Sequence, residues 1–271
     1  MRVVLCCLAK NEHLYIRDFV KWYLKLGFDT IYIFNNDEIG DNRLYSQFND
    51  NFNGKVEIID MRGIHKARFQ QEVYTNFYNT HEFDWCLFCD IDEFLMGIDN
   101  IKDFLNDPRF NNYEQIRIKW KLFGDDNLIH RDMSKPVYEV FKKEVRITYD
   151  RSLKKISNLQ HQGKAIVRGG LKDVVVTSPH FASRFERNNI LKSCLPSGKP
   201  CNSKIVINED YSNEHVFINH YMTKSLDEFI NQKLKRTDAV FEEINLDMSY
   251  YWRINKPSYE KLIYLKRMGI K

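Results

Sequence analysis

The sequence predicts an α/β fold, in which a mostly parallel sheet is flanked by helices on both faces. Two observations carry this prediction. Apolar runs alternate with helical periodicity through roughly the first hundred residues, and this strand–helix–strand order is typical of parallel sheets with crossover helices. The first run, Val3–Leu8, is continuously apolar, as expected of a strand that is covered on both faces.

The amino-terminal elements follow in order. Asn11 is the expected N-cap of a helix that stops at Gly27 and carries one apolar face, formed by Ile16, Phe19, Val20, Tyr23 and Leu24. Apolar residues that recur every four positions predict a second helix near residues 65–81. Further strands are expected at Thr30–Phe34, Val56–Ile59 and Trp85–Cys89.

The pattern changes in the second half of the chain. Gln115–Leu122 alternates apolar and basic residues, which predicts a strand with one wet face. Ser225 and Glu228 form a capping box, so a helix starts there. We also expect a pair of strands at Ala165–Val167 and Val174–Thr177, loops from Ser183 to Asn213, and a last helix at Ser258–Met268.

Length and composition narrow the class of protein. The 271 residues suffice for one large domain, and without repeats or a clear linker we expect a single domain made of residues 1–110, 111–224 and 225–271. A net charge of +4 is too mild for nucleic acid to be the main partner. No apolar run approaches the roughly 20 residues of a membrane span.

The amino end and the cysteines predict a cytoplasmic protein. The apolar run after Arg2 is short and lacks a small-residue cleavage signature, so a signal peptide is not expected. Six cysteines in a chain of this length do not resemble a disulfide framework. Cys86 and Cys89 point to opposite faces of the expected strand, so we interpret them as small core residues rather than metal ligands.

The most informative segment is the acidic end of the strand that begins at Trp85. The apolar run ends in Asp90, Asp92 and Glu93, at the sheet edge where such folds bind ligands. Two neighbouring carboxylates repel each other unless a cation or a proton lies between them. Hard divalent cations take oxygen ligands and are often shared with substrate phosphates, so the pattern favours a metal–diphosphate site. A strand-end turn is the plainer interpretation of Asp-x-Asp alone.

Other polar groups follow predicted strands. Ala9, Lys10, Asn11 and Glu12 end the first strand, at the crevice position for a nucleotide, although they equally fit a capped helix start. The second strand ends in a second polar group, Asn35-Asn36-Asp37, which by itself also fits a turn. His180 and His220 are single histidines, which are more often structural residues than ligands. No Gly-x-Gly-x-x-Gly is present, so the dinucleotide fingerprint is absent.

Taken together, these blocks resemble the family 2-like and family 92-like glycosyltransferases. They occur in the family order from Val4 to about Arg236, at Lys10–Glu12, Leu26–Asn36, Trp85–Phe94, Trp120–Gly124, Lys164–Arg168 and His220–Lys233. The chain departs from the family pattern in two places: Asp125-Asp126-Asn127 follows Gly124, where small residues and a glycine are usual, and the loop after Asn35-Asn36 is one residue longer.

The resemblance implies a GT-A fold, Mn²⁺ or Mg²⁺, and transfer of a hexose such as galactose from a UDP-sugar. The acceptor implied is an oligosaccharide or lipid-linked glycan of bacterial surface polysaccharide synthesis, and the transfer is expected to be inverting. By position, Asp90 and Asp92 match the metal- and donor-binding pair, and His180 and His220 match histidines near the donor phosphates, either of which is a candidate metal ligand. The nucleotide end and donor site match Ala9, Lys10, Asn11, Glu12, Asn35, Gln70 and Lys224.

The expected chemistry assigns further roles. Lys224 or Arg168 would add positive charge at the leaving diphosphate, and direct displacement needs a carboxylate base, for which we expect Asp126 or Asp125, with Glu93 as the alternative. A nucleotidyl- or phosphotransferase would use the same carboxylate–metal logic but would want a phosphate-cradling Gly-rich loop, which is not found. A non-catalytic carbohydrate-binding protein would need aromatic platforms and no paired metal ligands.

The carboxyl end carries a basic and aromatic segment. Its residues are Lys256, Tyr259, Lys261, Leu262, Ile263, Tyr264, Leu265, Lys266, Arg267 and Lys271. Such a segment is one way to hold an enzyme at an anionic membrane surface, here the inner face of the membrane that carries a lipid-linked acceptor. The plainer interpretation is the solvated face of a packed helix. The oligomeric state is left open.

Overall fold

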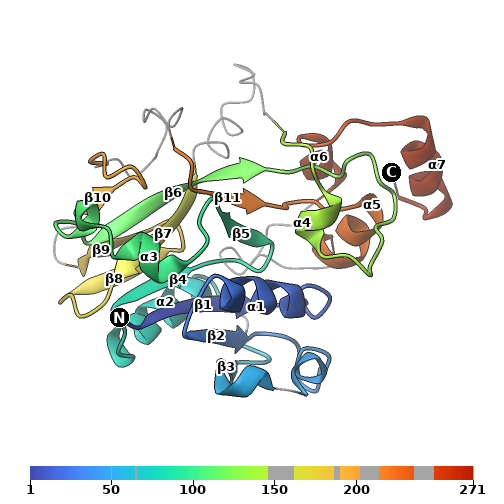
Figure 1. The fold of residues 1–271 in the computed structure, drawn as a ribbon. Helices are drawn as coiled ribbons and strands as arrows, with labels where there is room; N and C mark the ends of the chain where they lie inside the picture. The colour runs from blue at the N-terminus through green and yellow to red at the C-terminus, as the bar shows by residue number, and fades with distance from the viewer. Residues whose placement is uncertain are drawn as a thin grey trace.

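A mixed β-sheet of nine strands forms the centre of the described part of the chain (Figure 1). The computed structural model describes residues 1–49, 51–64, 66–145, 162–185, 190–201, 214–234 and 247–270. The strand order is β3-β2-β1-β4-β7-β6-β11-β5, and β10 pairs with β6 outside this path. The predicted α/β class is therefore confirmed.

The amino-terminal part of the sheet is parallel. Its strands are β1 (Val3–Ala9), β2 (Thr30–Asn35), β3 (Val56–Asp60) and β4 (Trp85–Phe88). Alternate residues of β1 point to opposite faces, as a strand requires. Val3, Leu5 and Cys7 share a core with helix α1 (Ile16–Lys25), whereas Val4, Cys6 and Leu8 share another with helix α2 (Phe69–Thr80). The prediction of helices on both faces is confirmed.

The second half of the sheet is mixed in direction. Strand β7 (Gly163–Arg168) runs antiparallel to β4 and to β6 (Gln115–Leu122), and β11 (Phe217–His220) lies between β6 and β5 (Glu93–Met96). Two-residue strand β10 (Ser193–Cys194) is parallel to β6. A separate hairpin is formed by β8 (Val174–Ser178) and β9 (Phe181–Arg184), which packs on α2.

The carboxyl-terminal helices gather at one end of the molecule and have their own small core (Figure 1). Helix α5 (Leu226–Glu228) continues into a π-helical turn (Phe229–Lys233), followed by α6 (Met248–Trp252) and α7 (Tyr259–Arg267). The shorter elements elsewhere are α3 (Ile101–Leu105), α4 (Val137–Val140) and the 3₁₀ turns Tyr45–Phe48, Asn51–Gly54 and Pro108–Phe110. None of the helices in the described ranges has the length and apolar character needed to cross a bilayer.

Several sequence-based predictions are corrected by the structure. Asn11 is not an N-cap, because helix α1 begins only at Ile16 and Asn11 has a left-handed φ of 59°. Arg117, expected on the wet face of β6, is buried. The two strands predicted near 165 and 174 are confirmed as β7 and β8, of which β7 enters the main sheet and β8 pairs with β9. The predicted loop region also contains the end of β9 and strand β10.

Other predictions have mixed outcomes. All six cysteines are buried and free, as expected of core residues. Part of the predicted loop segment, residues 186–189 and 202–213, and also His65 and Lys271, lie outside the described residues. The division into 1–110, 111–224 and 225–271 stays a prediction. The largest core joins residues of the first two segments, from β1 and α1 to β6 and β11.

Candidate metal and diphosphate site

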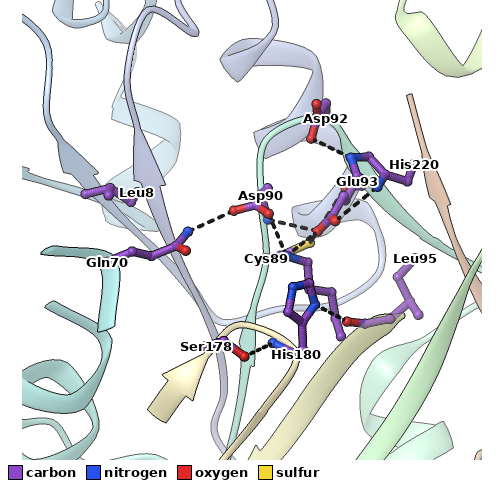
Figure 2. A network of polar contacts seen from close by, with 12 residues as sticks. Leu8, Gln70, Cys89, Asp90, Asp92, Glu93, Leu95, Ser178, His180 and His220 are labelled. Carbon is purple, nitrogen blue, oxygen red and sulfur yellow. Dashed lines mark hydrogen bonds and ion pairs between the residues drawn. The ribbon is translucent and has the colours of Figure 1, made fainter. Parts of the chain in front are cut away.

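The candidate site lies at the turn that connects β4, in the middle of the sheet, to β5 at its edge. Strand β4 ends at Phe88, and the chain turns through Asp90 and Asp92 before β5 begins at Glu93. A hydrogen bond from the Glu93 N–H to the Asp90 carbonyl, 3.2 Å long, closes this turn. Strand β4 pairs with β1 and β7, but β5 pairs with β11 at the far edge. The turn therefore carries three carboxylates from the middle of the sheet toward its edge strand, and Figure 2 shows them close to His220.

Asp90 is held by a buried lysine and a glutamine. Its Oδ2 lies 2.6 Å from Lys164 Nζ, and its Oδ1 accepts a hydrogen bond of 3.0 Å from Gln70 Nε2. Lys164, on β7, is fully buried, and its ammonium lies 3.2 Å from Glu93 Oε2 as well. Burial favours the neutral forms of Asp90 and Lys164, but the attraction between their charges is the larger effect. The pKa of Asp90 is therefore lowered and that of Lys164 is raised.

Asp92 faces a different set of cations. Its Oδ2 lies 3.0 Å from Lys233 Nζ and 3.8 Å from Lys224 Nζ, and its Oδ1 lies 3.5 Å from His220 Nε2. Burial alone would raise the pKa of Asp92, but Lys233, His220 and Lys224 together hold it well below its usual range. The two aspartates of the Asp-x-Asp pair are thus ionised but paired to different partners.

Glu93 and His220 complete a cluster with Asp92. The three residues each offer a ligand atom, and these atoms lie within 4.8 Å of one another. Figure 2 shows His220 between the two carboxylates, with His220 Nδ1 3.7 Å from Glu93 Oε1. Both of these buried atoms lack a hydrogen-bond partner. Burial raises the pKa of Glu93, and Lys164 only partly offsets the effect.

This donor set fits a divalent cation. Two carboxylates and one imidazole are ligands that Mn²⁺ accepts, and Mg²⁺ accepts the carboxylates. The unpartnered Glu93 Oε1 and His220 Nδ1 are the kind of buried polar atoms that a bound ion would satisfy. Asp90 does not belong to this cluster, and its oxygens contact Gln70 and Lys164. Its role as a metal ligand stays a prediction.

His180 lies in the turn between β8 and β9. Its Nδ1–H donates to the Gly163 carbonyl over 2.7 Å, which leaves Nε2 as an acceptor. Burial and then Lys164 lower the pKa of His180 to about 3, so the ring is neutral. The Trp120 ring contacts both histidines, with centroids 5.1 Å from His180 and 4.4 Å from His220. His180 is outside the Asp92–Glu93–His220 cluster.

The predicted nucleotide end forms at the carboxyl ends of β1 and β2. The Asn11 N–H donates to Asp37 Oδ1 over 2.5 Å, and the Asp37 N–H donates to Asn35 Oδ1 over 3.1 Å. Asn35 Nδ2 and Asp37 Oδ2 are buried without a partner, which leaves one donor and one acceptor. The other predicted residues lie beside them: the Ala9 carbonyl accepts from the Asn36 N–H, Lys10 pairs with Glu38 at 3.7 Å, and Glu12 is buried.

The predicted bases Asp125 and Asp126 have structural contacts. Asp125 is buried; its carboxylate accepts from the Tyr251 hydroxyl and pairs with Lys261, both on the carboxyl-terminal helices. Asp126, at a left-handed φ of 49°, accepts from the N–H groups of Lys142 and Lys143. A catalytic role for either stays a prediction.

Two functional candidates were missed by sequence reasoning. Lys164 starts an apolar strand, and a lysine in such a setting needs an acidic partner, so its signal was present. Lys233 belongs to the block His220–Lys233 that carries the family resemblance, but sequence reasoning gave it no role at the site, and its contact with Asp92 spans 141 positions. Arg168, which was expected to add charge at the diphosphate, donates instead to the Tyr113 and Phe110 carbonyls.

Comparisons with known proteins give weak likeness. No family model and no curated protein matches the chain. S. aureus TarS in complex with UDP is 16% identical at a TM-score of 0.36, covering 62% of this chain and 47% of that one. HddC from Yersinia pseudotuberculosis is 14% identical at a TM-score of 0.35, and the match covers 63% of this chain and 71% of that one. The mannosyltransferase PcManGT from Pyrobaculum calidifontis, in complex with GDP-Man and Mn²⁺, is 12% identical at a TM-score of 0.31. The match covers 43% of this chain and 35% of that one.

The chain spans only 22% to 47% of the TarS chains that it matches. Likeness at this level carries no argument about activity. The function of the chain therefore has to be argued from its own residues.

Proposed function

We propose that the protein is a metal-dependent glycosyltransferase of the GT-A type, related to the family 2-like and family 92-like enzymes. The observation that carries the proposal is the Asp92–Glu93–His220 cluster with lysines at its edge. Carboxylates suit a hard cation, and lysines suit a diphosphate. A non-catalytic carbohydrate-binding module does not need such a buried cluster of charged residues.

The proposed chemistry is displacement at the anomeric carbon of a UDP-hexose. The acceptor hydroxyl oxygen forms the new glycosidic bond, its proton passes to a base, and the bond from carbon to the UDP oxygen breaks. Asp92, Glu93 and His220 would hold Mn²⁺ or Mg²⁺, which supplies Lewis-acid stabilisation of the leaving diphosphate. Lys224 would add positive charge at the same place. Asp126, Asp125 and Glu93 are the candidate bases for an inverting transfer. The structural contacts of Asp125 and Asp126 count against these two, and a Glu93 that holds the ion is not free to act as a base, so substitution has to decide among the three.

A preference for uridine is part of the proposal. Asn35 Nδ2 and Asp37 Oδ2 are one unpartnered donor and one unpartnered acceptor at the predicted nucleotide end. A uracil ring presents carbonyl acceptors beside an N–H donor, so it can pair with both atoms. The preference over purine nucleotides rests on the family resemblance. Leaving such buried atoms unsatisfied is costly, which favours a ligand that pairs with them.

The acceptor we propose is an oligosaccharide or a lipid-linked glycan used in bacterial surface polysaccharide synthesis, reached in the cytoplasm or at the inner face of the membrane. This part rests on the family resemblance and on the basic carboxyl end.

Calorimetry tests the donor proposal. UDP, ADP and GDP are titrated into the protein with Mn²⁺ present and again with a chelator. We expect UDP to bind most tightly, and only with the metal. A clear preference for a purine nucleotide, or equal UDP binding in the chelator, would contradict the proposal. Release of UDP from a UDP-hexose then tests turnover.

A further inference from the structure

Two irregular stretches of backbone direct lysines at one carboxylate oxygen. Lys224 has a left-handed φ of 56°, which is uncommon for a lysine. Lys233 ends a π-helical turn, in which the Leu234 N–H bonds back five residues to the Phe229 carbonyl over 3.0 Å. Both ammonium groups approach Asp92 Oδ2. Backbone irregularities of both kinds concentrate at functional sites.

The two lysines differ in their freedom to move. Lys224 is 4% exposed and its ammonium lies 4.1 Å from the centroid of the Tyr15 ring, so it is fixed from both sides. The side chain of Lys233 is 16% exposed and sits at the end of its helix. Lys233 is therefore the more exposed of the two cations that face Asp92, and the one placed to change partner.

The charge balance around Asp92 determines which partners Lys233 can bind. Among the described residues, three lysines lie within 4.0 Å of the three carboxylates Asp90, Asp92 and Glu93, at 2.6, 3.2, 3.0 and 3.8 Å. A divalent cation added to this balanced set would leave excess positive charge, which a diphosphate would neutralise. The cation and Lys233 also compete for the same oxygen of Asp92.

We propose that Lys233 exchanges partners, pairing with Asp92 while no cation is bound and with the diphosphate of the donor once a divalent cation has bound Asp92. This inference rests on the proposed function and assigns Lys233 a role within it. Lys233 would thus weaken binding of the metal alone and strengthen binding of the nucleotide, so that cation and donor favour each other.

The exchange predicts opposite effects of one substitution. Lys233→Met keeps the length of the side chain and removes its charge. Titrated with Mn²⁺ alone, the variant should bind about 3- to 10-fold more tightly than the unmodified protein, because the ion no longer displaces a partly buried ion pair. Titrated with UDP at saturating Mn²⁺, it should bind about 10- to 100-fold more weakly, the size of one lost charge-assisted hydrogen bond.

Three controls sharpen the test. Lys233→Arg keeps the charge and should restore most of the UDP affinity, whereas Lys266→Met, at an exposed lysine of α7, should change neither titration. Uridine, which has no phosphate, should bind the unmodified protein and Lys233→Met equally. Circular dichroism and the melting temperature establish that each variant is folded.

The outcomes separate this inference from the proposed function. If the unmodified protein binds UDP with Mn²⁺ but Lys233→Met binds both ligands unchanged, the exchange is wrong and the proposed function stands. If the folded variant binds Mn²⁺ more weakly as well, Lys233 has a structural role only. If the unmodified protein binds no UDP, both the donor proposal and the diphosphate half of the exchange are overturned.

Discussion

Two acidic clusters follow strands of the same sheet, and their surroundings separate them. The first cluster is Asp90, Asp92 and Glu93 after β4, and the second is the pair Asp125 and Asp126 after β6. In the first, cations approach from three separate elements, and two buried ligand atoms of Glu93 and His220 have no hydrogen-bond partner. In the second, the carboxylates contact backbone N–H groups, the Tyr251 hydroxyl and Lys261.

This comparison indicates that a carboxylate is a functional candidate when buried polar atoms at its site lack hydrogen-bond partners. Neutralising Asp125 with one lysine and one hydroxyl accounts for its burial. The first cluster has three like charges close together, which is unfavourable unless a ligand or cations hold them. Acidic residues at strand ends look alike in sequence, but the partners that they find differ.

The largest effect should come from Asp92→Asn. The substitution removes a negative ligand from the Asp92–Glu93–His220 cluster while keeping the side-chain shape. We expect sugar transfer to fall at least about 100-fold, as when a charge-stabilising group is removed from an active site. The release of UDP from UDP-hexoses with Mn²⁺ measures it, beside the exposed control Asp99→Asn. Normal turnover by a folded Asp92→Asn protein would sink the site assignment.

Asp125→Asn should act on stability instead. It leaves Lys261, only 1% exposed, buried with an unpaired charge. Breaking a buried pair by removing one partner costs about 3–5 kcal/mol. Urea denaturation should show this loss, and Asp125→Asn/Lys261→Met should recover part of it because no lone charge remains. Lost turnover at a temperature where Asp125→Asn is fully folded would instead support Asp125 as the base.

The fold was largely predictable where contacts are local. Strands β1 to β4 are apolar runs joined by crossovers, and their parallel direction follows from the alternation of strands and helices along the chain. In the second half, β11 is only four residues long and pairs with β6 and β5, which come from far upstream. Periodicity cannot reveal such pairings, because it reports the faces of a segment and not its neighbours.

The same limit applies to the site. The carboxylates of the first cluster were visible because three acids end an apolar strand. Lys164 and Lys233 reach them across 74 and 141 positions, and only the folded sheet brings these residues together. The structural use of Asp125 likewise depends on α6 and α7, which lie 126 or more positions later. The sequence therefore shows which residue types end each strand, but it does not show which distant residues they contact.

A smaller effect is expected at Asp126. Its carboxylate accepts from two exposed backbone N–H groups, and asparagine tolerates the left-handed φ that the position requires. We expect Asp126→Asn to cost about 1 kcal/mol of stability, the size of a typical hydrogen bond, and to leave turnover near normal. Denaturation and UDP-release assays check both. A fall in turnover of two orders of magnitude without a change in stability would identify Asp126 as the base and break the contrast between the clusters.

The smallest effect concerns the basic carboxyl end. Lys261 is buried because it pairs with Asp125 of the second cluster, so it does not contribute to this surface. The exposed residues that remain are Lys256, Lys266, Arg267, Tyr259 and Leu262. Each exposed cation contributes about 1 kcal/mol near an anionic membrane, enough for weak, reversible attachment only. We expect pelleting with anionic vesicles at low salt, loss of pelleting at high salt, and weaker pelleting of Lys266→Ala/Arg267→Ala. Equal pelleting with neutral vesicles, or none with either lipid, would leave these side chains as the solvated face of a helix whose one buried lysine serves Asp125.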